Sequence, residues 1–394
     1  MSLFTNKRFV AAGIGHFTVD VLNGVRNVLL AFLSVPLGLT NTSLATIGMV
    51  YSIVAAVVQP FAGHFSDRHG RRWISAFGVF WMVFFFCLAM IIPGWPGLIL
   101  FIIASVGSGI FHPVGTVEAT LIGQADGNGH ESTATSIYFF FGQFGFFLGP
   151  ILAGAILDAW GQRGLFSLGL LGSLTGFYIL SAYKNVKVSV EEPEVSLEPV
   201  AQVENKRVWW YVAILIIVIT VDSWAGSNMS LFIPKYLSDL GQSASTYGLL
   251  ASLYIGAGAF GNVFGGYLAD RIARHKVIMA GFIIACIPIF FIAKTGYSLW
   301  YYLLLPIAGF TVGSVYSSLI IMAQKIFPGR MALASGLVLG FMFASGAIGA
   351  LISGVMADKL GVISVFYLTA GMLLVSGLLA FFLNSKLSHK APVL

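Results

Sequence analysis

The sequence predicts an all-α membrane protein in which twelve transmembrane helices form two pseudo-symmetric six-helix bundles. Apolar residues make up 58% of the 394 residues and charged residues only 9%, which excludes a water-soluble globular chain. The apolar residues gather in long stretches, and a membrane-spanning helix needs about 20 such residues. Motifs of the first half also recur in the second half at a nearly constant spacing, which indicates an internal repeat.

Glycine, proline or clustered charges separate the apolar stretches, and such residues mark the ends of helices. The first six predicted helices lie near residues 9–37, 43–65, 73–94, 97–122, 132–157 and 163–183. The second six lie near residues 208–237, 243–268, 276–295, 298–324, 330–356 and 361–384. Between them, 184–207 is polar and acidic, so we interpret it as a linker. It joins a bundle at 1–183 to a bundle and short tail at 208–394.

The basic residues indicate the orientation of the chain. If the N-terminus is cytoplasmic, most of the 21 Lys and Arg fall on the cytoplasmic side, as the positive-inside rule requires. We therefore predict a multi-pass protein of a bacterial-type inner membrane, with both termini and the linker in the cytoplasm. The net charge of +6 reflects this asymmetry rather than a nucleic-acid partner.

Three groups of residues repeat in the same order about 200 residues apart. Their carboxylates are Asp20 and Asp222, Asp67 and Asp270, and Asp158 and Asp358. Parallel six-helix repeats are typical of secondary transporters, whose substrate site lies near the middle of the bilayer.

The segment from Gly63 to Arg72 resembles the loop signature of the major facilitator superfamily. Gly63 would allow a close helix crossing, and a carboxylate at the membrane boundary can accept charge-assisted hydrogen bonds. The resemblance implies a cytoplasmic gate, and the alternative is a loop that only orients insertion. The gate candidates are Gly63, Asp67, Arg68, Arg71 and Arg72, with Asp270, Arg271 and Arg274 in the second copy.

The fifth predicted helix carries a series of glycines and one proline that resembles the signature of antiporters in this superfamily. Gly142, Gly145, Gly149 and Gly154 would form a smooth packing face, and Pro150 would bend the helix. The alternative is ordinary packing of small residues.

Ionisable residues within membrane spans are costly and therefore indicate function. His16, Asp20, Asn23 and Asn27 share one face of the first helix. Asp20 lies near mid-depth, and a carboxylate exposed alternately to either side can carry a proton. We predict proton-coupling roles for Asp20, His16, Asp222 and Glu118, while a structural hydrogen bond remains the alternative.

Arg26 keeps its charge at any physiological pH and would suit a carboxylate, phosphonate or phosphate. It could instead pair with a carboxylate of the chain or extend toward the membrane surface. Further substrate-binding candidates are His112, which precedes Pro113, and three asparagines, Asn23, Asn27 and Asn228.

The motif Phe111-His112-Pro113, together with His16 and Asp20, resembles the fosmidomycin-resistance group of drug-efflux facilitators. That resemblance implies drug export. The chain departs from the group at Val114 and Val117, so substrate identity is not carried over.

The sequence therefore predicts a proton-coupled exporter of small organic molecules, possible anions included, working by alternating access. The alternatives are an uptake symporter for an organic acid or other metabolite and a receptor built on a transporter scaffold. No Walker loop, HExxH motif or nucleophile elbow is present in the sequence. We expect a monomer in the lipid bilayer without enzymatic activity, cofactor or metal.

Overall fold

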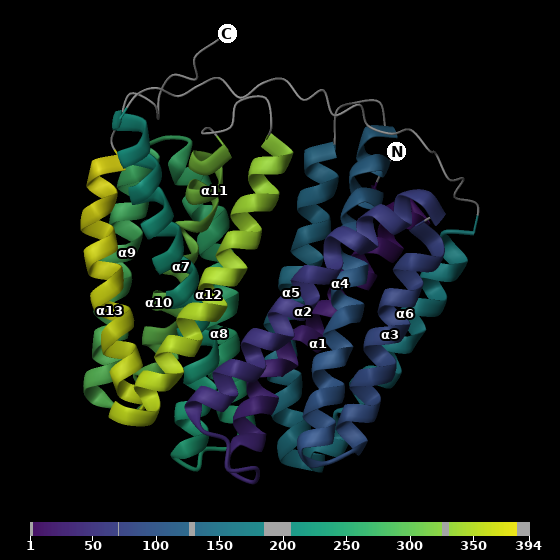
Figure 1. Cartoon of the computed structure of the whole chain (residues 1–394), viewed down its shortest axis with the longest axis horizontal. Coiled ribbons are helices and arrows are strands. Elements are labelled where there is room, and N and C mark those ends of the chain that lie inside the picture. The colour runs from purple at the N-terminus through teal and green to yellow at the C-terminus, as the bar shows by residue number, and fades with distance from the viewer. Residues whose placement is uncertain (1–2, 70, 126–130, 185–205, 325–330, 384–394) are drawn as a thin grey trace. The chain divides into compact units, whose positions relative to one another are not determined.

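The computed structural model describes residues 3–69, 71–125, 131–184, 206–324 and 331–383. Every regular element in these ranges is a helix (Figure 1). The α-helices of the first half are α1 (Lys7–Ser34), α2 (Asn41–His69), α3 (Arg71–Ile91), α4 (Gly94–Ala125), α5 (Glu131–Gly164) and α6 (Phe166–Ala182). Those of the second half are α7 (Lys206–Asp239), α8 (Ala244–Ala269), α9 (Arg274–Thr295), α10 (Tyr301–Gly313), α11 (Tyr316–Gln324), α12 (Met331–Leu360) and α13 (Val362–Leu379). Short 3-10 helices cover Leu3–Thr5 and Ala380–Leu383.

Eleven spans in the described ranges are long and apolar enough to cross a membrane. α10 and α11 together supply one of them, Tyr301–Ala323, and the remaining predicted span corresponds to the shorter α6. The helical membrane fold class thus agrees with the structure, whereas the arrangement in two six-helix bundles stays a prediction. Most of the predicted linker and the predicted tail, residues 185–205 and 384–394, lie outside the described residues.

Large apolar side chains cover much of the surface, as lipid contact requires. Phe260 and Val263 of α8 are both 74% exposed, and Trp210 at the start of α7 is 73% exposed. Water would make such exposure unfavourable, but the hydrocarbon of a bilayer solvates these side chains.

Residue contacts divide the chain into two units. The first contains α1, α2 from Ile47 onward, α3 to α6, and the segment Ser238–Ser252 at the end of α7 and the start of α8. The second contains Thr40–Thr46, α7 up to Leu237, α8 from Leu253 onward, and α9 to α13. Each unit thus includes a short segment of the other sequence half.

In the first unit, α1 packs against α4, α5 and α6, and α3 packs against α4 and α6. In the second unit, α9 packs against α10 and α13, and α13 also contacts α12. Figure 1 shows α3 beside α6 and α9 beside α13. The polar residues of α1 therefore face other helices of the first unit.

Candidate functional site

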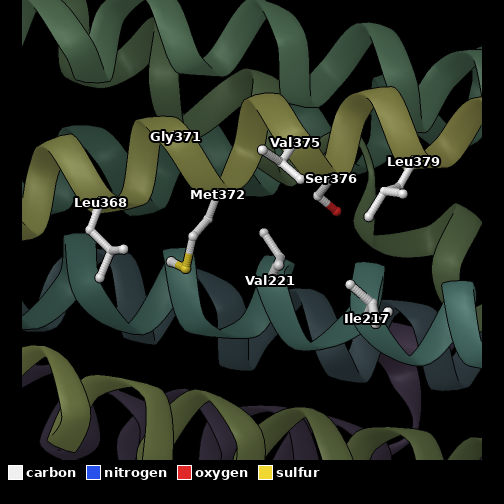
Figure 2. A pocket seen from close by; sticks show the side chains of 8 residues that line it. All are labelled: Ile217, Val221, Leu368, Gly371, Met372, Val375, Ser376 and Leu379. Carbon is white, nitrogen blue, oxygen red and sulfur yellow. The ribbon is translucent and has the colours of Figure 1, made fainter.

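A groove of about 390 Å³ lies between α7 and α13 in the second unit (Figure 2). Its lining is apolar, with Ile217 and Val221 of α7 opposite Met372 and Val375 of α13, and Ser376 adds one hydroxyl group. The groove lining includes no ionisable residue, so it offers no group that could bind a proton or an anion. It suits hydrocarbon chains, and the polar chemistry lies elsewhere.

In the first unit, Asp20 of α1 lies between two histidines. Its Oδ2 is 3.2 Å from Nε2 of His16, which is one turn earlier on the same helix. Its Oδ1 is 3.3 Å from Nε2 of His112 on α4. The side chain of His16 is 4% exposed, that of Asp20 16% and that of His112 23%. The structure thus brings together three residues that the sequence identified separately as candidates.

Backbone carbonyl groups fix both imidazole rings. Nδ1 of His16 lies 2.9 Å from the carbonyl oxygen of Tyr138, and Nδ1 of His112 lies 2.8 Å from that of Ser108. A carbonyl oxygen only accepts hydrogen bonds, so each Nδ1 is the donor and carries the hydrogen. Each Nε2 is consequently the atom that faces Asp20.

Close packing of α5 on α1 depends on glycine at three positions. A Cβ on Gly145 or Gly149 would lie closer than 3.0 Å to a carbonyl oxygen of α1. A Cβ on Gly142 would lie closer than 3.0 Å to Nε2 of His16 and to Oδ2 of Asp20. Gly142 therefore lets the backbone of α5 pack directly against these two atoms.

The other predicted packing residues differ from one another. A Cβ on Gly154 would also meet a backbone carbonyl, that of Ala244 at the start of α8. The predicted close crossing at Gly63 is wrong within the described residues, because among them a Cβ there would meet nothing nearer than Pro113 at 3.9 Å, an ordinary contact. Pro150 lies inside α5, as predicted.

A chain of hydrogen bonds leads from Asp20 toward Arg26. Asn23 Nδ2 donates to Asp20 Oδ1 at 2.9 Å and to Ser108 Oγ at 3.0 Å. The Tyr51 hydroxyl donates to Asn23 Oδ1 at 2.8 Å. The guanidinium of Arg26 lies 5.2 Å from the centre of the Tyr51 ring, a cation–π distance.

Arg26 is held by neutral groups. Its Nε donates to Asn27 Oδ1 at 3.2 Å, and its Nη1 donates to Ser52 Oγ at 2.9 Å. Among the carboxylates that the structure describes, none forms an ion pair with it. Arg26 therefore contributes a positive charge that the described chain leaves uncompensated.

Glu118 stands apart from the Asp20 cluster. Its side chain is fully buried and contacts the guanidinium of Arg8, and Nε of Arg71 donates to it at 2.9 Å. Arg72, the residue after Arg71 in the sequence, donates its Nε–H to the carbonyl oxygen of Leu180 instead. Two arginines neutralise Glu118, which favours an anchor between α1, α3 and α4 over the predicted proton-coupling role.

The predicted gate is described only in part. The side chains of Asp67 and Arg68 lie outside the described residues. In the second copy, Asp270 is 73% exposed and lies 3.9 Å from Nη2 of Arg274, while Arg271 stacks on a tyrosine ring of α8. A gate role for these residues stays a prediction.

Asp222 of α7 lies in the second unit and is 5% exposed. Its Oδ1 has no hydrogen-bond partner within the described part of the chain. The hydroxyl groups of Tyr254 and Tyr316 are close enough to interact with its charge. Asn228, a predicted substrate-binding residue, is fully buried and donates to Thr369 of α13, which favours a structural role for it.

Sequence reasoning missed several neutral partners of these groups. Ser108, Tyr51, Ser52 and the carbonyl of Tyr138 hold the polar residues described above. Ser108 could have been found, because it lies one helical turn before His112. The other three lie on α2 and α5, whereas the residues that they hold lie on α1. Only the packing of the helices therefore reveals them.

The described part of the chain is thus a helical membrane fold with polar residues buried on α1, α4 and α7. The family model of the Major Facilitator Superfamily matches residues 12–225 and 215–393. The chain belongs to this superfamily. It is therefore an integral multi-pass membrane protein and a transporter.

Individual relatives agree with this membership. The fosmidomycin resistance protein of Escherichia coli (strain K12) is 27% identical over 385 residues, which cover 96% of this chain and 93% of that protein. The multidrug resistance protein MdtG of Salmonella typhimurium (strain LT2) is 28% identical over 264 residues, 63% of each chain. The predicted resemblance to the fosmidomycin-resistance group is confirmed.

A solved structure shows the same fold. A bacterial homologue of the human lysosomal transporter Spinster superposes with a TM-score of 0.78 over 95% of this chain and 96% of that one. The sequence identity is 13%, so the likeness concerns the fold alone.

Proposed function

We propose that this transporter exports small organic anions in exchange for protons, by alternating access. The single observation that carries the proposal is the position of Arg26, a positive charge within the apolar helix α1 that pairs with no described carboxylate. The proposed proton carrier is Asp222.

Arg26 supports an anionic substrate for an energetic reason. A guanidinium does not lose its proton, and a charge among membrane helices is costly unless it is paired. Asn27 and Ser52 use two of its five N–H donors and supply no charge. A carboxylate, phosphonate or phosphate group of a substrate would supply both the missing charge and the missing acceptors.

Asp222 supports proton coupling. Burial of an ionised carboxylate with one oxygen lacking a hydrogen-bond partner is costly, which favours the neutral acid in this environment. Tyr254 and Tyr316, which lie near it, are both neutral phenols. A conformational change that exposed Asp222 to water would allow it to release the proton.

Export is supported by the names of the relatives, which describe resistance to fosmidomycin and to multiple drugs. A resistance protein of this superfamily protects a cell when it removes the compound. Uptake symport of an organic acid uses the same fold, so the direction of proton movement has to decide between the two.

The deciding experiment uses vesicles that contain the purified protein and a trapped pH indicator. Fosmidomycin, a phosphonate, is added outside at equal pH on both sides. Antiport moves protons outward as the compound enters, so the internal pH should rise. A fall in internal pH would indicate symport, and an unchanged pH during uptake would contradict proton coupling.

Substitutions at Arg26 test the anion site in the same vesicles. Loss of a charged hydrogen bond costs roughly 1.5–3 kcal/mol, so Arg26→Gln should raise the apparent KM for fosmidomycin at least about tenfold. Arg26→Lys keeps the charge without the planar fork and should be intermediate. The control is Arg163→Gln, at an exposed position near the end of α5. An unchanged KM in Arg26→Gln would remove Arg26 from the binding site.

A further inference from the structure

The cluster of His16, Asp20 and His112 presents three electron-pair donors to one small space. Both Nδ1 atoms donate to backbone carbonyl oxygens, so each neutral imidazole directs the lone pair of Nε2 toward Asp20. The two Nε2 atoms lie 3.2 Å and 3.3 Å from the carboxylate oxygens. When both imidazoles are neutral, these lone pairs and the carboxylate repel one another at this distance, and a cation among them, either a proton or a metal ion, removes the repulsion.

We propose that His16, Asp20 and His112 form a binding site for a divalent transition-metal cation such as Zn²⁺ or Co²⁺. The ligand spacing supports this assignment. Ligand atoms about 2.1 Å from a tetrahedral Zn²⁺ lie about 3.4 Å from one another. Each Nε2 lies at a similar distance from one carboxylate oxygen, that of His16 from Oδ2 and that of His112 from Oδ1. One potential ligand atom from each of the three residues lies within 4.8 Å of the others.

The surroundings are those of a metal site. Histidine ligands of metals usually donate their second N–H to a carbonyl or carboxylate group, which fixes the ring and the tautomer. Both histidines here do so, to Tyr138 and Ser108. Asn23 also donates to Oδ1 of Asp20 at 2.9 Å and orients the carboxylate.

Gly142 provides an independent observation. A Cβ at this position would lie closer than 3.0 Å to both His16 Nε2 and Asp20 Oδ2. Any other residue would therefore displace these two ligand atoms. The backbone of α5 thus packs directly against the cluster and holds His16 and Asp20 in place.

The donor set selects the class of metal. Two imidazole nitrogens and one carboxylate suit Zn²⁺, Co²⁺ and Ni²⁺, whereas Mg²⁺ and Ca²⁺ prefer oxygen ligands throughout. Three protein ligands leave a fourth position for water or an anion. His112 and Asp20 are partly exposed while His16 is buried, so the ion would enter from the side of His112 and Asp20.

This site goes beyond the proposed function and does not depend on it, because neither Arg26 nor Asp222 is a ligand. The test is titration of the purified, untagged and chelator-treated full chain with Co²⁺, measured by the visible absorption of the bound ion. We expect one Co²⁺ per chain with the intense spectrum of a four-coordinate site, displaced by Zn²⁺ but not by an equal concentration of Mg²⁺. A wild-type chain that binds Co²⁺ no better than Mg²⁺ overturns the proposal.

Variants locate the site. His112→Ala and His16→Ala each remove one ligand and should weaken Co²⁺ binding at least about tenfold. Gly142→Ala keeps every ligand but adds a Cβ that collides with His16 and Asp20, so it should weaken binding as well. The matched control is His64→Ala, at an exposed position of α2, which should bind as the wild type does. Unchanged binding in both histidine variants overturns the proposal.

One measurement does not depend on folding of the variants. X-ray absorption of Zn²⁺ bound to the wild-type chain counts imidazole ligands, and fewer than two overturns the proposal. Arg26→Gln and Asp222→Asn should bind Co²⁺ normally. Failure of the metal site is thereby distinguishable from failure of the proposed transport.

Discussion

Asp20 and Asp222 follow the same two residues, Thr and Val, in the two sequence repeats, but their surroundings differ. Asp20 contacts two histidines and accepts a hydrogen bond from Asn23. Asp222 is more deeply buried, and within the described residues its Oδ1 has no hydrogen-bond partner. Asp20 thus has two histidine neighbours of a type that binds metals. Asp222 has surroundings in which a protonated, neutral carboxyl group is less costly than a charged one.

The difference arises from the residues around each carboxylate. Positions that carry a polar residue or glycine near Asp20 carry buried apolar residues at the equivalent positions of the second repeat. His16 corresponds to Val218, Asn23 to Ala225 and Gly142 to Met342. A duplicated helix thus keeps the carboxylate at the same repeat position, while its neighbours differ between the two units.

The largest effect is expected for Asp222→Asn. Asparagine mimics the neutral acid but releases no proton, so fosmidomycin accumulation driven by a pH gradient should fall to the level of protein-free vesicles. Exchange of labelled for unlabelled compound should continue, because it needs no net proton movement. Asp20→Asn should show the opposite pattern, with Co²⁺ binding lost and pH-driven transport retained.

Asp239→Asn is the control for this comparison, because Asp239 lies on the same helix at an exposed position. It should retain pH-driven transport. If Asp20→Asn abolishes that transport and Asp222→Asn does not, the proton carrier is the histidine cluster and the comparison is reversed.

The sequence alone favoured Asp20 over Asp222 as proton carrier, because His16, a residue type that can share a proton, lies one turn away on the same helix. Periodicity places residues on one face of a helix, so it found the His16–Asp20 pair. It could not place His112, which reaches Asp20 from α4, or show that α5 packs against the pair at Gly142. Contacts between helices follow from packing, which a single sequence does not encode locally.

The fold was predictable to a larger extent, because apolar length and repeat spacing depend only on neighbouring residues and on order along the chain. The predicted spans agree with the helices to within a few residues in most cases, as for 276–295 and α9 (Arg274–Thr295). The range of α5 runs to Gly164, but Gly161 has a non-helical φ of +63° and breaks the helix within a few residues of the predicted end at 157.

The next largest effect is a loss of stability, and it distinguishes buried Glu118 in the first unit from exposed Asp270 in the second. Glu118→Gln should lower the free energy of unfolding by about 3–5 kcal/mol, because it leaves Arg8 and Arg71 without their buried partner. Asp270→Asn should change it by less than about 1 kcal/mol, since that side chain is 73% exposed. Thermal unfolding in detergent measures both. Equal losses would show that exposure does not distinguish the two ion pairs.

The smallest effect concerns a feature that the two units share. Asp158 at the end of α5 accepts hydrogen bonds from the first backbone N–H groups of α8, those of Ala244 and Ser245, at 2.7 Å and 2.8 Å. Asp358 at the end of α12 accepts the equivalent bonds from Asn41 and Thr42 of α2, at 2.7 Å and 3.0 Å. Both carboxylates thus act as N-terminal caps, and both oppose the positive end of a helix dipole.

Loss of such a cap costs about 0.5–2 kcal/mol, so Asp158→Ala and Asp358→Ala should each lower the melting temperature by a similar, small amount. Asn retains an acceptor oxygen and caps nearly as well, so Asp158→Asn and Asp358→Asn should lose less than the alanine variants. The caps bind backbone N–H groups, which every residue except proline supplies. Asp358 also accepts a hydrogen bond from the Thr42 hydroxyl at 2.6 Å, but the backbone bonds do not require a particular neighbouring side chain. Repeat equivalence should therefore predict the caps although it fails for Asp20 and Asp222. A loss confined to one of the two alanine variants would show that the surroundings differ at the caps as well.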